Sequence, residues 1–220
     1  MPQSAPESTA ATALKQAAMR LFAERGTDGV TVREIARAAG QLNHGAVGYH
    51  FGSKDALIRE IVADGARIID QRRNARLDLL EAAGGPFTVR EVIDTIIYPS
   101  LALFGPDEDE CYLRFIMILT MTRRELFDAA AVDERWNRGY QRCLAHLRRL
   151  MPPMPAAHAN QRLVFVGAYI AQILALRQAR LSDTSRVHAT WPAESTLRHL
   201  AQTAATMLEA PGFAASEAAE

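Results

Sequence analysis

The sequence has little cysteine, few aromatic residues and no excess of charge of either sign. Its two cysteines, Cys111 and Cys143, lie far apart in 220 residues, which excludes a disulfide framework and suits a reducing compartment. We expect both thiols to be buried structural groups. Basic and acidic side chains number 25 each, so the chain is not a polycation. Any binding of nucleic acid therefore requires a local cluster of positive charge.

Long hydrophobic runs are also missing. The most apolar stretch, residues 164–176, is about 13 residues long and too short to span a bilayer. Residues 1–12 are small and polar and lack the basic and then apolar pattern of an export signal. We therefore expect a cytoplasmic protein with no membrane partner, and disordered tails at residues 1–9 and 211–220.

Strand signals are nearly absent, whereas apolar residues recur at spacings of three and four along most of the chain. This periodicity predicts an all-α protein of about nine helices. A break at Gly84-Gly85-Pro86 separates two regions. We predict a three-helix helix-turn-helix domain at 10–52, a linker helix at 53–84, and a larger helical ligand-binding and dimerisation domain at 85–210.

The helix-turn-helix prediction comes from the segment 31–51. Thr31 and Glu34 have the spacing of a capping box, which opens a helix, and a tight turn with Gly40 follows. Asn43 is placed to cap a second, short helix whose surface is kept low by glycine and alanine. Such a helix allows backbone and short side chains to approach base edges in the major groove of DNA.

The same segment resembles the TetR family of bacterial repressors. The resemblance covers about residues 10–57 and is carried by the strings LFAERG (21–26), TVREIARAAG (31–40) and NHGAVGYHFGSKDALI (43–58). It implies a dimer that binds a palindromic double-stranded DNA operator. It also implies that the positions facing the groove are Asn43, His44, Gly45, Ala46 and Gly48. The positions that contact phosphates or flanking bases would be Thr31, Arg33, Tyr49, His50 and Lys54, and Phe51 would lie in the core.

The second region offers a candidate site for a small-molecule effector. Pro99 lies within a predicted helix at 88–104, where it must bend the helix beside a helix at 107–121 that we expect to be buried all round. A bend of this kind can leave an apolar pocket. We expect His146 or Gln172 to supply a polar anchor. The candidate ligand-binding residues are Tyr98, Phe104, Tyr112, Phe115, Met121, Trp136, Tyr140, Phe165, Tyr169 and Gln172.

The last two predicted helices, 156–181 and 193–208, indicate a homodimer. The first is apolar on most of its circumference, so we expect one face to pack on the domain core and another to pack on a partner subunit. The resemblance implies a two-fold dimer through these two helices. The second helix carries an apolar stripe that we expect to join the partner, formed by Leu197, Leu200, Ala201, Ala204 and Leu208.

Two other interpretations remain open at this stage. The protein can be a ligand-independent or activating DNA-binding regulator, or an all-helical interaction module. An enzyme is disfavoured because the sequence has no nucleophile elbow, no phosphate loop and no pair of acids on one face. The six histidines are scattered without paired spacing, so we expect no metal site and no cofactor.

Overall fold

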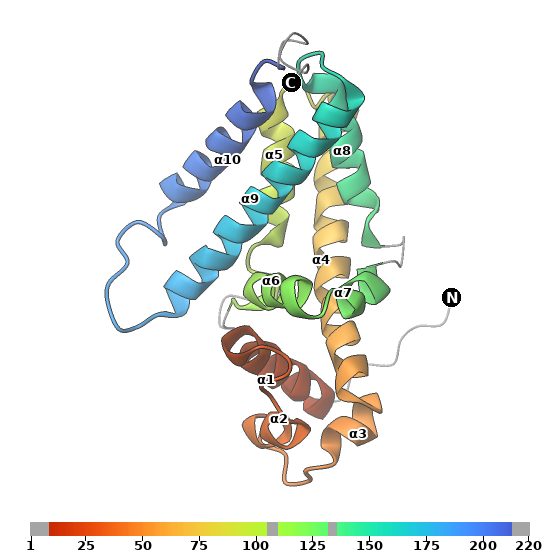
Figure 1. Ribbon diagram of the computed structural model, residues 1–220, viewed down its shortest axis with the longest axis vertical. Helices are drawn as coiled ribbons and strands as arrows, with labels where there is room; N and C mark the ends of the chain where they lie inside the picture. Colours follow the sequence, from red (N-terminus) through yellow and green to blue (C-terminus); the bar gives the residue numbers. More distant parts are fainter. Residues whose placement is uncertain (1–8, 105–109, 132–135, 213–220) are drawn as a thin grey trace, which may run out of the picture.

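The computed structural model describes residues 9–104, 110–131 and 136–212. Within these ranges the chain forms ten α-helices and one short 3-10 helix, with no strand (Figure 1). The all-α prediction is confirmed, and the helix number is close to the nine expected. The predicted tails fall mostly on residues outside the described ranges.

The first three helices lie together at one end of the molecule, and a long fourth helix runs from them toward the opposite end (Figure 1). Thr31 and Glu34 form the predicted capping box, with Glu34 N donating to Thr31 Oγ1 at 3.3 Å and Thr31 N donating to Glu34 Oε2 at 2.8 Å. Ser53 caps the fourth helix, with its Oγ accepting a hydrogen bond from Ala56 N at 3.1 Å. The bounds are α1 Thr9–Arg25, α2 Val32–Ala38, α3 Ala46–Phe51 and α4 Lys54–Ala82.

The remaining helices surround the far half of α4, with α6 and α7 crossing between the two ends (Figure 1). α6 packs on both α1 and α9, and α7 packs on α4. The helices of this region are α5 Val89–Ile97, the 3-10 helix η1 Tyr98–Ser100, α6 Tyr112–Thr122, α7 Arg124–Ala131, α8 Arg138–Leu150, α9 Ala156–Ser182 and α10 Glu194–Glu209.

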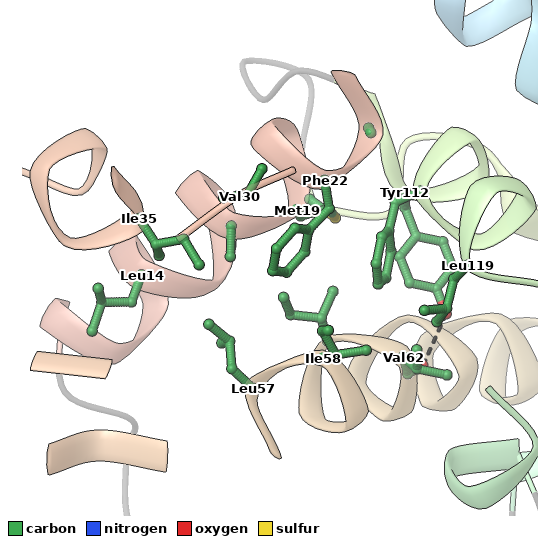
Figure 2. Close-up of a cluster of buried hydrophobic side chains, with 14 of the residues drawn as sticks. Leu14, Met19, Phe22, Val30, Ile35, Leu57, Ile58, Val62, Tyr112 and Leu119 are labelled. Atoms are coloured by element: carbon green, nitrogen blue, oxygen red, sulfur yellow. Dashed lines mark hydrogen bonds between the residues drawn. The ribbon is translucent and has the colours of Figure 1, made fainter. Parts of the chain in front are cut away.

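A first core, which we call the lower core, joins α1–α3 to the start of α4 and to α6 (Figure 2). The rings of Phe22 and Phe115 stack with their centroids 5.9 Å apart, and both side chains are fully buried. Tyr112 donates a hydrogen bond of 2.8 Å from its hydroxyl to the Val62 carbonyl of α4 (Figure 2). Since burial of this apolar surface drives the packing, α6 is fixed against the helix-turn-helix end of the chain.

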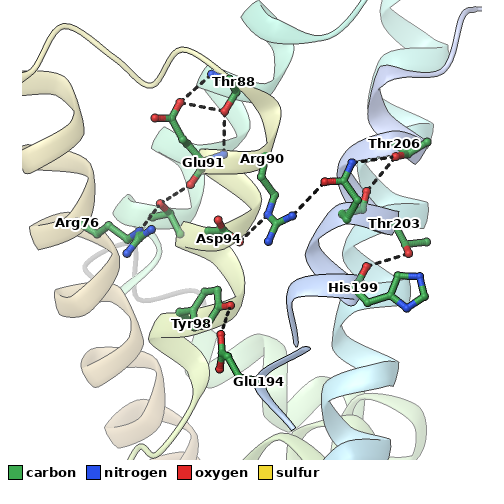
Figure 3. Close-up of polar contacts among 12 residues, drawn as sticks. Arg76, Thr88, Arg90, Glu91, Asp94, Tyr98, Glu194, His199, Thr203 and Thr206 are labelled. Atoms are coloured by element: carbon green, nitrogen blue, oxygen red, sulfur yellow. Dashed lines mark hydrogen bonds and ion pairs between the residues drawn. The ribbon is translucent and has the colours of Figure 1, made fainter. Parts of the chain in front are cut away.

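A second core, the upper core, lies among α5, α8, α9, α10 and the far end of α4. Polar contacts tie α5 to its neighbours: Arg90 donates to Gln202 of α10 at 3.1 Å, and Arg76 of α4 donates to Thr95 at 3.2 Å (Figure 3). The apolar stripe on α10 is used here. Contrary to our prediction that it joins a partner, it is buried within the same chain at Leu197, Leu200, Ala201, Ala204 and Leu208.

Two further expectations were wrong, and one helix was not predicted. Pro99 does not bend a continuous helix: α5 ends at Ile97 and Pro99 lies in η1, because proline lacks the amide hydrogen needed to continue an α-helix. α6 is not buried all round, since Met121 is 80% exposed. No helix was predicted at α7, which begins one residue after α6 breaks at Arg123. Residues 107–109, where the helix predicted at 107–121 was expected to begin, lie outside the described ranges.

By length and composition α9 alone, among the described helices, could cross a membrane, and 28% of its 18-residue apolar window is buried. Core helices of globular proteins pass the same test, so this is weak evidence. α9 packs on α6 and α10 within the chain. Its buried side is therefore explained by the upper core.

The packing of α4 against α6 predicts the effect of one glycine substitution. A Cβ added at Gly65 would lie 2.1 Å from the ring of buried Tyr112. We expect Gly65→Ala to lower the free energy of unfolding by about 1–3 kcal/mol through overpacking. Gly48 in α3 is a matched control, because a Cβ there meets nothing within 4 Å. Gly48→Ala should leave stability equal or up to about 1 kcal/mol higher, and equal denaturation midpoints for both variants would contradict the packing described.

Candidate nucleic-acid interface and internal cavity

The second helix of the predicted motif, α3, is short, and a glycine in the left-handed region lies in the turn before it and at its end. Gly40 in the turn before it and Gly52 at its end have φ of +70° and +77°, which residues with a side chain adopt rarely. Asn43 Oδ1 accepts a 2.8 Å hydrogen bond from Gly45 N in the turn that leads into α3. The helix itself begins at Ala46, later than the predicted start at Asn43.

The outer face of this segment is open to solvent. Tyr49 is 84% exposed, and Asn43, His44, Gly45 and Gly48 are exposed as well. These residues belong to the turn before α3 and to α3 itself. A Cβ at Gly48 would meet nothing within 4 Å, so the helix surface is low at this point.

Two members of the motif face inward. Ala46 was predicted to face the groove, but it is only 5% exposed and packs in the lower core, because α3 needs an apolar side to rest on α4. Phe51 packs on the same core, as the resemblance implied.

Leu42 was not among the predicted contact residues. It is 99% exposed in the turn, and an apolar group in that position can contact thymine methyl groups.

Positive charge beside α3 comes mainly from α2. Arg33 and Arg37 are exposed, and neither forms an ion pair with any residue the structure describes. Arg25 instead pairs with Glu34 at 2.8 Å. Hydrogen bonds from the Thr31 backbone and from Arg25 lower the pKa of Glu34 to about 2. The capping box therefore fixes α2 while its two outer arginines stay available for phosphates.

His50 and Lys54 make contacts within the protein, whereas the resemblance implied contacts to DNA. His50 is half-buried, and its ring meets the Tyr49 ring edge-on at 5.0 Å between centroids. Lys54 Nζ donates to the carbonyls of Thr27 and Val30 at 3.0 and 3.1 Å. Lys54 thus joins the start of α4 to the turn between α1 and α2, and this contact accounts for two of its three N–H donors.

Arg123, between α6 and α7, connects the two halves of the chain. Its guanidinium lies 3.3 Å from Asp28 in the turn after α1 and 3.4 Å from Asp55 at the start of α4. Its Nε is 2.5 Å from Glu125. These carboxylates hold the pKa of Arg123 above its ordinary value. An arginine of the second region therefore reaches both ends of the helix-turn-helix unit.

A cavity of about 450 Å³ lies between the two cores, within the range of small-molecule sites. Its walls come from α4, α5, α6, α8 and α9, and most of the lining side chains are aliphatic. The polar and aromatic groups of the lining are fewer: Arg73, Ser100, Tyr112, Phe127, Trp136, Asn137, Tyr140 and Gln141.

Three of the ten candidate ligand-binding residues, Tyr112, Trp136 and Tyr140, line this cavity. The other seven lie outside its lining. Tyr98 donates to Glu194 at 2.8 Å (Figure 3), Phe104 meets the Tyr112 ring from outside, Phe115 fills the lower core, and Tyr169 packs on the upper core. Met121, Phe165 and Gln172 are exposed.

The expected polar anchors also lie elsewhere. His146 contacts Glu81 at 2.8 Å between α8 and α4, and it does not line the cavity. The charged group in the lining is Arg73 of α4, which was not among the predicted residues. The sequence shows Arg73 only as an arginine on a long helix. The opposite wall of the cavity comes from segments far away in the sequence, so its place in the lining is seen only in the folded chain.

The contacts of Lys54 predict a loss of stability on its removal. Lys54→Met deletes two hydrogen bonds from a charged donor to half-buried carbonyls and should lower the free energy of unfolding by about 1.5–3 kcal/mol. Arg59→Met, at an exposed position on the same helix, should change it by less than about 0.5 kcal/mol. Urea denaturation measures both. A Lys54→Met midpoint equal to that of the parent would mean that this ammonium does not anchor α4.

Comparison with known proteins agrees with this arrangement. A family model described as "Bacterial regulatory proteins, tetR family" matches residues 14–61, close to the range of the predicted resemblance. An HTH-type transcriptional repressor of Mycobacterium tuberculosis is 48% identical over 52 residues, which are 24% of this chain and only 27% of that relative. The HTH-type transcriptional regulator BetI of Agrobacterium fabrum is 31% identical over 189 residues, covering 84% of this chain and 86% of the relative.

Solved structures show the same fold at low sequence identity. A tetR family transcription regulator from a Shewanella species aligns with a TM-score of 0.57 and 14% identity, over 92% of this chain and 97% of that one. The regulator PfmR of Thermus thermophilus aligns with a TM-score of 0.56 and 15% identity, over 91% and 99%. Together with the full-length similarity to BetI, these findings show that the chain belongs to the TetR family of transcriptional regulators.

Proposed function

We propose that this protein is a one-component repressor of the cytoplasm: a homodimer that binds a palindromic DNA operator and is released from it by a small molecule. The observation that carries the proposal is that one helix, α4, adjoins both the candidate DNA-binding surface and the cavity. α4 begins beside the exposed face of α3 and continues along the wall of a cavity of about 450 Å³.

The proposed operator contacts follow from exposure. Tyr49, His44 and the glycines of the α3 surface meet base edges, and Arg33 with Arg37 meets phosphates on either side. Thr31 contributes through the N-terminus of α2, because its side chain is already used in the capping box. His50 and Lys54 act from behind this surface, with one donor of Lys54 left for a phosphate.

The proposed dimer uses the outward faces of α9 and α10. Val164 and Phe165 on α9 are 68% and 58% exposed, and Met207 on α10 is 37% exposed. Large apolar side chains exposed on adjacent helices are typical of a partner interface. A second copy of this chain is the occupant that a palindromic operator requires, since two recognition helices about 34–36 Å apart read successive turns of the groove.

The cavity favours ligand control over the ligand-independent alternative, for which a well-packed second region would be expected. The interaction-module alternative gives no reason for an exposed, glycine-lowered α3. A ligand that binds two conformations unequally couples to DNA binding by about 1–3 kcal/mol.

Selection of tight binders from random duplex DNA tests the operator proposal. The purified protein should enrich a near-palindromic sequence with two half-sites. Tyr49→Ala removes an exposed side chain, so it should weaken operator binding at least tenfold and leave the denaturation midpoint unchanged. A selection that yields no consensus, or a Tyr49→Ala variant with full affinity, would contradict the proposed surface.

A charge placed on α9 tests the dimer. Phe165→Glu should shift the protein to monomers in sedimentation and weaken operator binding, because a carboxylate cannot be buried unpaired in an apolar interface. Leu79→Glu on α4 is the matched control, since Leu79 is 75% exposed and lies on a helix outside the proposed interface. Two variants that sediment alike would place the interface elsewhere.

A further inference from the structure

Arg73 lies in the wall of the cavity with few partners. Its Nη2 donates to the Ile96 carbonyl at 3.2 Å and to Ser100 Oγ at 3.4 Å. Its Nε is buried and has no hydrogen-bond partner in the described part of the chain. The guanidinium carbon lies 5.4 Å from the centre of the Tyr140 ring, so the cation faces an aromatic surface of α8.

No described carboxylate forms an ion pair with Arg73. Asp70, one turn earlier on α4, accepts from Gly139 N at 2.6 Å and from Asn74 Nδ2 at 2.8 Å. It lies near enough to attract the guanidinium but forms no ion pair with it. Desolvation lowers the pKa of Arg73 from its ordinary value. A guanidinium nevertheless stays charged in proteins, so the cavity holds a positive charge without a direct counter-ion.

The rest of the lining suits an amphipathic molecule. No Asp or Glu of the described ranges lines the cavity, and aliphatic side chains form most of its wall. Tyr140 also lines the cavity; its hydroxyl lies beside Gly167, another lining residue, and makes no hydrogen bond to a described residue. The lining thus offers one cation, hydroxyl and amide donors from Tyr140, Asn137 and Gln141, and a mainly apolar remainder.

We propose that the cavity binds a small monocarboxylate with an apolar body, with the carboxylate paired to Arg73 and hydrogen-bonded by Tyr140. This inference rests on the proposed function and deepens it by giving the charge class of the effector. Arg–carboxylate pairing satisfies the orphaned Nε and is strongest in a site from which water is excluded. A cationic ligand would be repelled by the same group.

The position of Arg73 links the ligand to DNA binding. In the structure its guanidinium ties α4 to Ile96 of α5 and Ser100 of η1. A bound carboxylate competes for these donors, which loosens α4 from α5 and η1. Because α4 begins at Lys54 beside α3, a shift of α4 moves the recognition helix.

Ligand binding to the full chain without DNA tests the proposal first. Calorimetric titration compares three probes of equal length, namely decanoate, 1-decanol and decyltrimethylammonium, and adds 1-naphthylacetate as a carboxylate of different shape. At least one carboxylate should bind ten times more tightly than the alcohol, and the ammonium probe more weakly than either. Equal binding of carboxylate and alcohol, preference for the cation, or no binding of either carboxylate at millimolar concentration would overturn it.

Two neighbouring arginines provide variants for the carboxylate that binds. Arg73→Gln should lose the carboxylate preference by at least tenfold, and Arg73→Lys should restore part of it. Arg72→Gln is the matched control, because Arg72 donates to the Leu101 and Ala102 carbonyls and does not line the cavity. Full carboxylate affinity in Arg73→Gln would overturn the assignment. If that variant does not fold, the probe comparison on the parent chain still decides.

Operator binding, measured separately, distinguishes the two proposals. A carboxylate that binds through Arg73 without changing operator affinity supports the assignment of the cavity and contradicts effector release. If the protein binds its operator but the cavity binds charged and neutral probes equally, the carboxylate proposal is contradicted and the DNA-binding proposal is not.

Discussion

The continuity of α4 is the constraint on which the rest of this structure depends. A single helix of 29 residues contributes Leu57, Ile58 and Ile61 to the lower core and Leu77 to the upper core. Between them it presents Arg73 to the cavity. Because a regular helix transmits displacement along its axis with little bending, neither end can move without consequences at the other.

The polar contacts of α4 explain how such a movement reaches DNA. Lys54 fastens its first turn to the carbonyls after α1, and Arg123 contacts Asp55 in the same turn. Farther along the helix, Arg72 and Arg73 hold the last turn of α5 and the segment after it. α4 is therefore held at its start and beside the cavity by charge-assisted hydrogen bonds, which are directional and can be exchanged for a ligand, while the apolar contacts keep the fold intact.

Local signals were sufficient for the helix-turn-helix end and much less so for the cavity. The capping box at Thr31 and the cap at Ser53 were predictable because each depends on residues three apart. Ala46 was misplaced because the local sequence does not reveal which side of a six-residue helix rests on α4. The cavity needs walls from α4, α5, α8 and α9, so its charged residue, Arg73, could be found only after the chain was folded. The stripe on α10 failed for a related reason: periodicity identifies an apolar face but not whether the same chain or a partner covers it.

The most direct test of this account is the distance between the two helix-turn-helix ends of the dimer, measured by electron spin resonance with a label at the exposed position Arg59 on α4. Both native cysteines are buried, which favours selective labelling of Arg59→Cys. The account predicts one distance distribution with operator bound and a displaced one when the cavity is saturated with the carboxylate that binds it. An unchanged distribution at saturation, with binding confirmed on the labelled protein, would contradict transmission through α4.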